Sequence, residues 1–259
     1  GEVDPINAPM SDYRARRIAE LLKERDDHDV ESFRRIQLDT RSIQAAEFLE
    51  ILRPLLGVGP LADALRDWDC HYDLDSAGAT AFEMFYAELL VERFGPACGT
   101  EVIEHLRDGS GTFIDFHQNF DRVLVAESSP WLGDRSRDAV WSAALARVVD
   151  RTPEPWGERN QITLTNMFFG GKLPRFLGFD PGPIPIRGGR ATPHQGQIYV
   201  SGGRLTSFTP SLRFVADMSA PELHTAICGG PSDRRFSKHY KSGLEGWLAG
   251  KLKLRRPPS

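Results

Sequence analysis

Apolar residues recur with the period of an amphipathic helix through the first half of the chain. The spacing i, i+3, i+4, i+7 appears behind Ser11, Ser42 and Ser76, residues of a type that caps the first turn of a helix, and again before Asp150. The pattern predicts that residues 11–150 are almost wholly helical, with shorter helices at 30–36, 59–68, 99–107 and 113–125. The apolar members of the four main segments are Ala15, Ile18, Ala19 and Leu22; Ala45, Phe48, Leu49 and Leu52; Phe82, Phe85, Tyr86 and Leu89; and Trp141, Ala144, Leu145 and Val148.

The pattern changes after residues 151–155, where glycine and proline become frequent and short β-prone runs replace the helical stripes. Residues 170–196 show no regular period and are expected to form an irregular segment that packs on the rest of the chain. The sequence therefore predicts an α+β fold, with a helical region over 1–155 and a strand-rich region over 156–259 that ends in a helix near 239–250. The runs expected as strands are 162–164, 197–200, 212–215 and 224–227.

Composition places the chain among globular proteins. Its 259 residues are 40% hydrophobic and 26% charged with a net charge of −4, which excludes disorder, collagen and a coiled coil and argues against a nucleic-acid partner. No apolar run is long enough to span a bilayer, so no membrane partner is expected. The three cysteines lack CxxC spacing, which argues against a zinc site or a dense disulfide framework and leaves a single disulfide open.

The familiar catalytic signatures are missing, since the sequence has no GxSxG, GxxxxGK[ST], HExxH or strand-linked GxGxxG motif. The acidic stretch 67–75 lacks the glycine and closing glutamate of a calcium loop, so helix capping is favoured over metal binding, and no cofactor is expected. His117 is interpreted as a packed histidine. His194, in a loop, is the better functional candidate. The glycine-rich run 229–233 is interpreted as a corner after a strand rather than a ligand-binding turn.

Several motifs nevertheless occur in an order that resembles one family. Ser11–Ile18 contains "YRARRI", residues 36–45 read "IQ.D..S..A", and residues 68–82 read "WD...D..S.....F", followed by "WG" at Trp156. Residues 211–217 match "S.R.V.D" and residues 229–247 match "GG.S....S.HY......W". Together they resemble the later part of the β subunit of the penicillin acylase (penicillin amidase) family of N-terminal-nucleophile hydrolases. Two positions depart from the pattern, with Asn160 where a histidine is usual and Asp233 where a glycine is usual.

The resemblance implies a layered αββα sandwich and a precursor that excises a spacer to expose a serine at the β-chain N-terminus. That serine attacks an amide carbonyl while its own α-amino group accepts the proton, and a backbone N–H with an asparagine side chain stabilises the oxyanion. A chain that opens at Gly1 is expected to lack both groups. Only Arg14 matches a family site position, where it would help hold the oxyanion asparagine and the substrate. The alternative, a surface arginine on a helix, stays open.

The expected function is therefore that of a C-terminal fragment of an amidohydrolase that cleaves the amide bond of an N-acyl substrate. A β-lactam, an acyl-homoserine lactone and a lipopeptide all remain candidates. The expected partners are the α subunit and the N-terminal part of the β subunit, and the family implies a periplasmic or secreted protein. The alternative is a catalytically dead scaffold or binding module that keeps the acylase fold.

Overall fold

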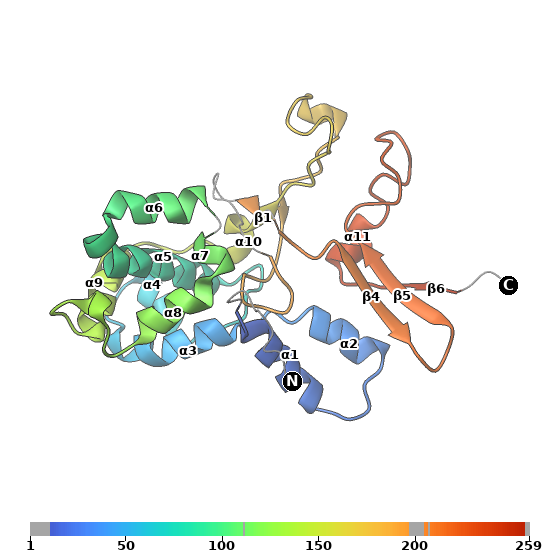
Figure 1. Ribbon diagram of the computed structural model, residues 1–259. Helices are drawn as coiled ribbons and strands as arrows, with labels where there is room; N and C mark the ends of the chain where they lie inside the picture. The colour runs from blue at the N-terminus through green and yellow to red at the C-terminus, as the bar shows by residue number, and fades with distance from the viewer. Residues whose placement is uncertain (1–10, 111, 197–204, 207, 257–259) are drawn as a thin grey trace, which may run out of the picture.

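A helical body and two smaller sheets make up the protein, so the fold is α+β as the sequence predicts (Figure 1). The computed structural model describes residues 11–110, 112–196, 205–206 and 208–256. The α-helices are α1 (Tyr13–Lys23), α2 (Val30–Gln37), α3 (Ile43–Leu52), α4 (Pro60–Arg66), α5 (Ala77–Cys98), α6 (Thr100–Gly109), α7 (Thr112–Asp115), α8 (His117–Val125), α9 (Arg137–Ala146), α10 (Trp156–Arg159) and α11 (Leu244–Leu248). Three 3-10 turns are η1 (Arg53–Leu55), η2 (Pro130–Leu132) and η3 (Arg175–Leu177).

All named strands in the described residues follow α10. They are β1 (Gln161–Ile162), β2 (Ile184–Pro185), β3 (Leu205–Thr206), β4 (Leu212–Asp217), β5 (Glu222–Ile227) and β6 (Lys253–Arg255). Before residue 156 the only pairing within the described part is an isolated bridge between Arg41 and His71. The expected strand at 197–200 lies outside the described residues. A domain boundary at residue 155 stays a prediction.

Two of the three predicted helix caps are present. The Ser42 hydroxyl accepts the Ala45 N–H at 3.1 Å, and the Ser76 hydroxyl accepts the Ala79 N–H at 3.1 Å, so α3 and α5 begin where the sequence indicates. Ser11 is different, because α1 begins at Tyr13 with Asp12 in the capping position and no side-chain cap. The hydroxyl of Ser11 instead accepts the N–H of Tyr13 at 3.3 Å.

Two other helices differ from expectation in extent. The helix expected at 113–125 is broken at Phe116 into α7 and α8. The final helix is only five residues long and ends before Gly250, whose positive φ of 65° is the left-handed conformation that terminates helices.

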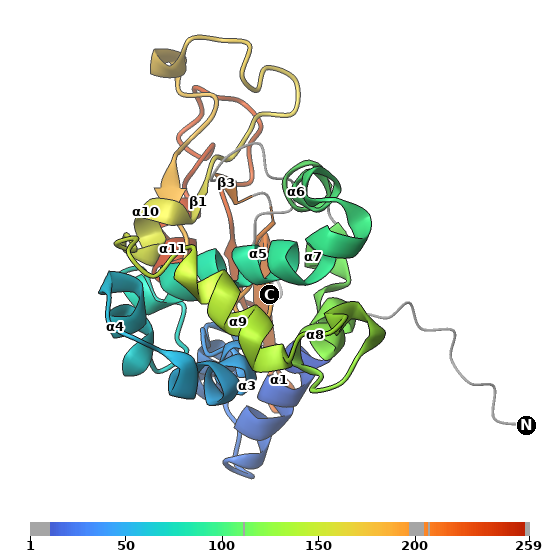
Figure 2. The ribbon, with the colours of Figure 1, turned by 90° about the vertical axis from the view of Figure 1, so that its left-hand side faces the viewer.

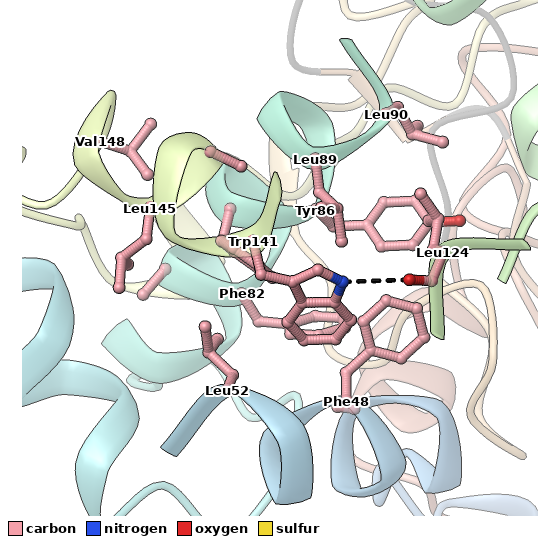
Figure 3. Close-up of a cluster of buried hydrophobic side chains, with 14 of the residues drawn as sticks. Phe48, Leu52, Phe82, Tyr86, Leu89, Leu90, Leu124, Trp141, Leu145 and Val148 are labelled. Carbon is pink, nitrogen blue, oxygen red and sulfur yellow. Dashed lines mark hydrogen bonds between the residues drawn. The ribbon is translucent and has the colours of Figure 1, made fainter. Parts of the chain in front are cut away.

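The helical body is organised around α5, which contributes an apolar row that is fully buried. Trp141 of α9 packs on this row, stacks against Phe48 of α3 at 5.3 Å between ring centroids, and donates its indole N–H to the Leu124 carbonyl at 3.0 Å (Figure 3). Phe82 lies edge-on to Phe48 at 5.8 Å. Burying side chains of this size contributes about 1.5–3 kcal/mol each, so this cluster supplies much of the driving force for folding.

The two sheets have three strands each. In the first, β1 lies between β2, which is antiparallel, and β3, which is parallel. In the second, the strands are antiparallel in the order β4-β5-β6. Along β4 the side chains of Arg213 and Val215 are buried, whereas Leu212 and Phe214 are 53% and 56% exposed. Leu223 of β5 is also exposed on this side, and we call these three residues the outer face.

The glycine-rich run after β5 forms a corner, as predicted. Gly230 packs so closely on the backbone that a Cβ there would lie 1.8 Å from the His239 carbonyl oxygen, and Gly229 has a φ of 115°. Both positions therefore need glycine for local geometry. No ligand-binding role is required to explain these two glycines.

Neither a metal site nor a disulfide is found in the described part of the chain. It contains no group of three or more histidine, cysteine or carboxylate side chains that could hold a metal ion, and Cys70, Cys98 and Cys228 are all free. In the acidic stretch, Asp69 accepts the His71 N–H at 3.0 Å and Asp73 accepts the Thr40 hydroxyl at 3.1 Å, so these carboxylates serve local structure. None of the described helices combines the length and apolar character needed to cross a membrane.

Candidate functional site

An irregular segment, residues 186–196, lies where the helical body meets the strands, and we call it the central loop. Asn160 fixes its backbone, since the Asn160 amide nitrogen lies within 3.0 Å of the carbonyl oxygens of Ile186 and Gly196 and 3.2 Å of that of Gly188. The indole N–H of Trp156 also donates to the Gly188 carbonyl, at 2.9 Å. The loop has few hydrogen-bond partners of its own. Its carbonyl groups are therefore satisfied by side chains of α10 and of Asn160, which follows α10 directly.

Arg14 reaches the same loop from α1. Its Nε donates to the Thr192 carbonyl at 3.1 Å and its Nη2 to the Pro193 carbonyl at 3.5 Å. The side chain is half-buried, and burial lowers the pKa of its guanidinium, which still carries its charge at neutral pH. These contacts argue against a surface arginine and make Arg14 a fixed cation between α1 and the central loop.

His194 is enclosed rather than available for proton transfer. Its side chain is 4% exposed and its Nε2 lies 2.9 Å from Nη2 of Arg213. Because an arginine only donates, Nε2 must accept, and the ring proton sits on Nδ1. Burial, followed by the charges of Arg213 and Arg187, lowers the pKa of His194 to about 3. A histidine that stays neutral and is almost fully enclosed is a structural group, so it is a poor general base.

Arg213 completes this contact from β4. Its Nη1 donates to the Trp247 carbonyl at 2.7 Å, and its guanidinium lies over the Trp247 ring at 4.5 Å. Burial lowers the pKa of Arg213 to about 10. Arg213 of the "S.R.V.D" motif and Trp247 at the end of the last motif are therefore partners. Both support the central loop through the contact of Arg213 with His194.

Asp39 ties the loop to the "IQ.D" motif. Its carbonyl accepts the His194 N–H at 2.9 Å, while its carboxylate accepts two bonds from Arg17, at 2.9 and 3.1 Å. Arg17 therefore has a structural role, which is to hold Asp39. Its position on a different face of α1 from Arg14 does not indicate this role. Arg16, by contrast, pairs with Asp12 and Glu47 at an exposed position.

A buried polar cluster that the sequence patterns do not reveal lies beneath α1. Asp121 is 1% exposed and accepts the Tyr86 hydroxyl at 2.7 Å and the Gln44 amide at 2.8 Å. Burial raises the pKa of Asp121 to about 6, although the hydrogen bonds act in the opposite direction. Tyr13, which also interacts with this carboxylate, stacks on His117 at 5.9 Å. His117 is thus packed, as expected.

The cluster connects to the central loop through Arg190. Its Nη1 donates to Glu83 at 2.6 Å, and its guanidinium lies 4.3 Å from the centre of the Tyr86 ring. The other oxygen of Glu83 accepts the Tyr72 hydroxyl at 2.8 Å. Glu83 of α5 thus has its charged partner 107 positions away along the chain, in the central loop.

Taken together, residues from motifs far apart in the sequence meet at the central loop: Arg14, Asp39, Trp156 and Arg213 all contact it. The sequence profile of one family, penicillin amidase, matches residues 4–255. The chain belongs to the penicillin amidase family. Four of the motifs noted in the sequence therefore each supply a residue that holds this one loop.

Two proteins illustrate the relationship. The chain is 23% identical over 290 aligned positions to the acyl-homoserine lactone acylase QuiP of Pseudomonas aeruginosa, an alignment that covers 92% of this chain and 34% of that protein. It shares its fold with a thermostable penicillin G acylase from Alcaligenes faecalis, with a TM-score of 0.59, 16% identity, and coverage of 93% of this chain and 48% of that chain. The chain thus spans about a third of the one and about half of the other.

Proposed function

We propose that this chain is the C-terminal part of the β subunit of an acylase that hydrolyses the amide bond of an N-acyl substrate. The nucleophile, an N-terminal serine released by autoproteolytic processing, and the asparagine of the oxyanion hole would lie outside residues 1–259. The serine hydroxyl attacks the carbonyl and its α-amino group takes the proton; the amine then leaves, and water releases the acyl group. Relatives in this family support a periplasmic or secreted location.

The observation that carries the proposal is the placement of Arg14. A charged, half-buried guanidinium held by two loop carbonyls is a rigid group, and rigid donors aimed at a reacting centre need no reorganisation during the reaction. Neither His194 nor Asp121, both buried, is placed to exchange protons with a substrate. The contribution of this chain is therefore to position groups, while proton transfer belongs to the N-terminal serine and its amine.

The outer face of the second sheet supports the proposed partner. Leu212, Phe214 and Leu223 leave an apolar surface uncovered by the described residues, and a sheet whose one face is apolar and open is typical of a layer that packs on another. The remainder of the acylase, meaning the α subunit and the N-terminal part of the β subunit, is the proposed occupant. The amide would be that of a β-lactam, an acyl-homoserine lactone or a lipopeptide, and a β-lactam substrate would imply a role in antibiotic metabolism.

The test compares the 259-residue chain alone with the product of the same gene that includes its upstream coding sequence. Amine release is measured from one substrate of each of the three classes. We expect no turnover by the chain alone and turnover by the longer product. Activity of the chain alone would contradict the proposal. A longer product that carries no processed serine, threonine or cysteine and turns over none of the substrates would support a catalytically dead scaffold instead.

A further inference from the structure

Two long loops project away from the helical body at the same end of the molecule (Figures 1 and 2). They comprise residues 163–182 and 229–243, and we call them the tip. Arg235 Nε donates to the Leu177 carbonyl at 2.6 Å, and the Tyr240 hydroxyl donates to the Phe179 carbonyl at 2.5 Å. The rings of Phe179 and Phe236 lie 6.5 Å apart. The two loops therefore form one structural unit.

The tip concentrates exposed aromatic side chains. Three phenylalanines in the described part of the chain are more than 60% exposed, and all three belong to the tip: Phe168 at 69%, Phe176 at 84% and Phe236 at 84%. Met167 beside them is 90% exposed. Single exposed apolar residues are common on protein surfaces, but a group of this kind on one projection marks a contact surface.

The tip is also strongly basic, in contrast to the chain as a whole. It carries six lysines and arginines against two aspartates, a net charge of +4, although the complete chain carries −4. None of these six cations forms an ion pair with a carboxylate of the described residues, and both oxygens of Asp180 accept backbone N–H groups, those of Asn166 at 2.7 Å and Gly171 at 2.9 Å. The positive charge is therefore not neutralised locally. The cations are Lys172, Arg175, Arg234, Arg235, Lys238 and Lys241.

We propose that the tip docks on an anionic lipid bilayer surface, with its phenylalanines entering the headgroup region and its cations contacting the lipid phosphates. Exposed phenylalanine beside lysine and arginine is the combination that binds such interfaces, since apolar burial and electrostatic attraction add together. The outer face of the second sheet has two cations beside it, Lys253 and Arg255 of β6, fewer than the six of the tip. This inference goes beyond the proposed function, because it concerns where the protein binds and not which bond it cleaves. It also revises the expectation of no membrane partner, which rested on the lack of an apolar run long enough to span a bilayer and does not bear on binding at the bilayer surface.

Vesicle flotation of the intact protein tests the inference. We expect binding to vesicles of phosphatidylcholine with phosphatidylglycerol, and little binding to phosphatidylcholine alone. Binding should weaken as the salt concentration rises, because screening shortens the Debye length from about 10 Å at 0.1 M to about 3 Å at 1 M. The double substitution Arg234→Glu with Lys238→Glu should weaken binding at least about tenfold, and Phe176→Ser with Phe236→Ser about tenfold.

Matched substitutions away from the tip serve as controls. Val58→Ser changes a side chain that is 91% exposed, and Lys23→Glu reverses an exposed charge at the end of α1, so both should leave vesicle binding unchanged. The tip residues changed are exposed, and thermal melts confirm that each variant is folded. Failure of the intact protein to bind anionic vesicles, or equal effects of tip and control substitutions, would overturn the inference. Protection of the tip from protease in the absence of lipid would assign it instead to an internal contact with the rest of the acylase.

Discussion

Arg213 and His194 meet in the protein interior with 2.9 Å between Nη2 and Nε2, so a permanent cation faces a histidine that must remain neutral. The contact joins β4 to the central loop, and Arg14 joins the same loop to α1. The central loop has little regular structure of its own, so its position depends on these side chains. Changing them should therefore reveal how the loop contributes to stability and to activity.

Arg14→Ala in the proposed acylase should lower kcat/KM by about a hundredfold, the usual cost of losing one positioned interaction. It should also reduce stability by about 1–3 kcal/mol, because two loop carbonyls lose a charged donor. Arg14→Lys should not restore the rate, since a lysine cannot reproduce the planar fork. Steady-state kinetics and thermal melts measure the two effects separately.

Arg16→Ala is the matched control for this prediction, because Arg16 is on the same helix, is exposed, and interacts with two carboxylates and the Tyr13 ring but not with the central loop in the described residues. It should change stability by less than about 0.5 kcal/mol and leave kcat/KM unchanged. Arg17 is unsuitable as a control, since it holds Asp39 with two bonds. Equal and small effects at Arg14 and Arg16 would remove Arg14 from the site.

Asn160→Asp should destabilise the protein more than Asn160→Ala does. The amide nitrogen of Asn160 faces three carbonyl oxygens, and a carboxylate in its place would offer only acceptors to them. Alanine loses the donors without adding repulsion, so it serves as the control, with an expected cost of about 1–3 kcal/mol. Thermal melts of the two variants decide the order, and an aspartate variant as stable as the alanine variant would contradict this account.

The sequence could predict those parts of the fold that have a local period or a local cap. Ser42 and Ser76 identify the starts of α3 and α5, and the β-prone run at residues 212–215 identifies β4. The partner of Arg14 could not be predicted from periodicity, because it lies 178 residues further along the chain. Tyr86 shows a second limit. It occupies a position in an apolar stripe, yet its hydroxyl binds a buried carboxylate that the stripe does not reveal.

Asp121 should make the protein less stable as the pH rises from about 4 to about 6. Its folded pKa of about 6 lies above the value of about 3.9 for a free aspartate, so in this window the folded state keeps a proton that the unfolded state has lost. The stabilisation that protonated Asp121 contributes is complete below about pH 4 and is lost as the pH rises through about 6. At about 1.4 kcal/mol per pKa unit, the change is at most about 3 kcal/mol.

Asp121→Asn should remove this pH dependence, because an amide does not titrate. The Gln44 amide can turn its oxygen toward the new donor, since that oxygen has no partner among the described residues. Unfolding free energies of the two proteins across this pH range should converge at the acidic end and separate toward pH 6. A constant difference at every pH would mean that Asp121 does not titrate in this window.

His194 should act in the opposite direction. Its folded pKa of about 3 lies below the value of about 6.5 for a free histidine, so the unfolded state takes up a proton first as the pH falls. The stability associated with neutral His194 is therefore complete above about pH 6.5 and decreases progressively toward pH 3, by about 2 kcal/mol between pH 7 and pH 5. In His194→Gln the side-chain oxygen can still accept from Arg213 but cannot titrate, so this decrease should be absent. Unfolding measured at these two pH values in both proteins provides the comparison, and an NMR titration of the His194 ring above pH 5 would contradict the buried, neutral state.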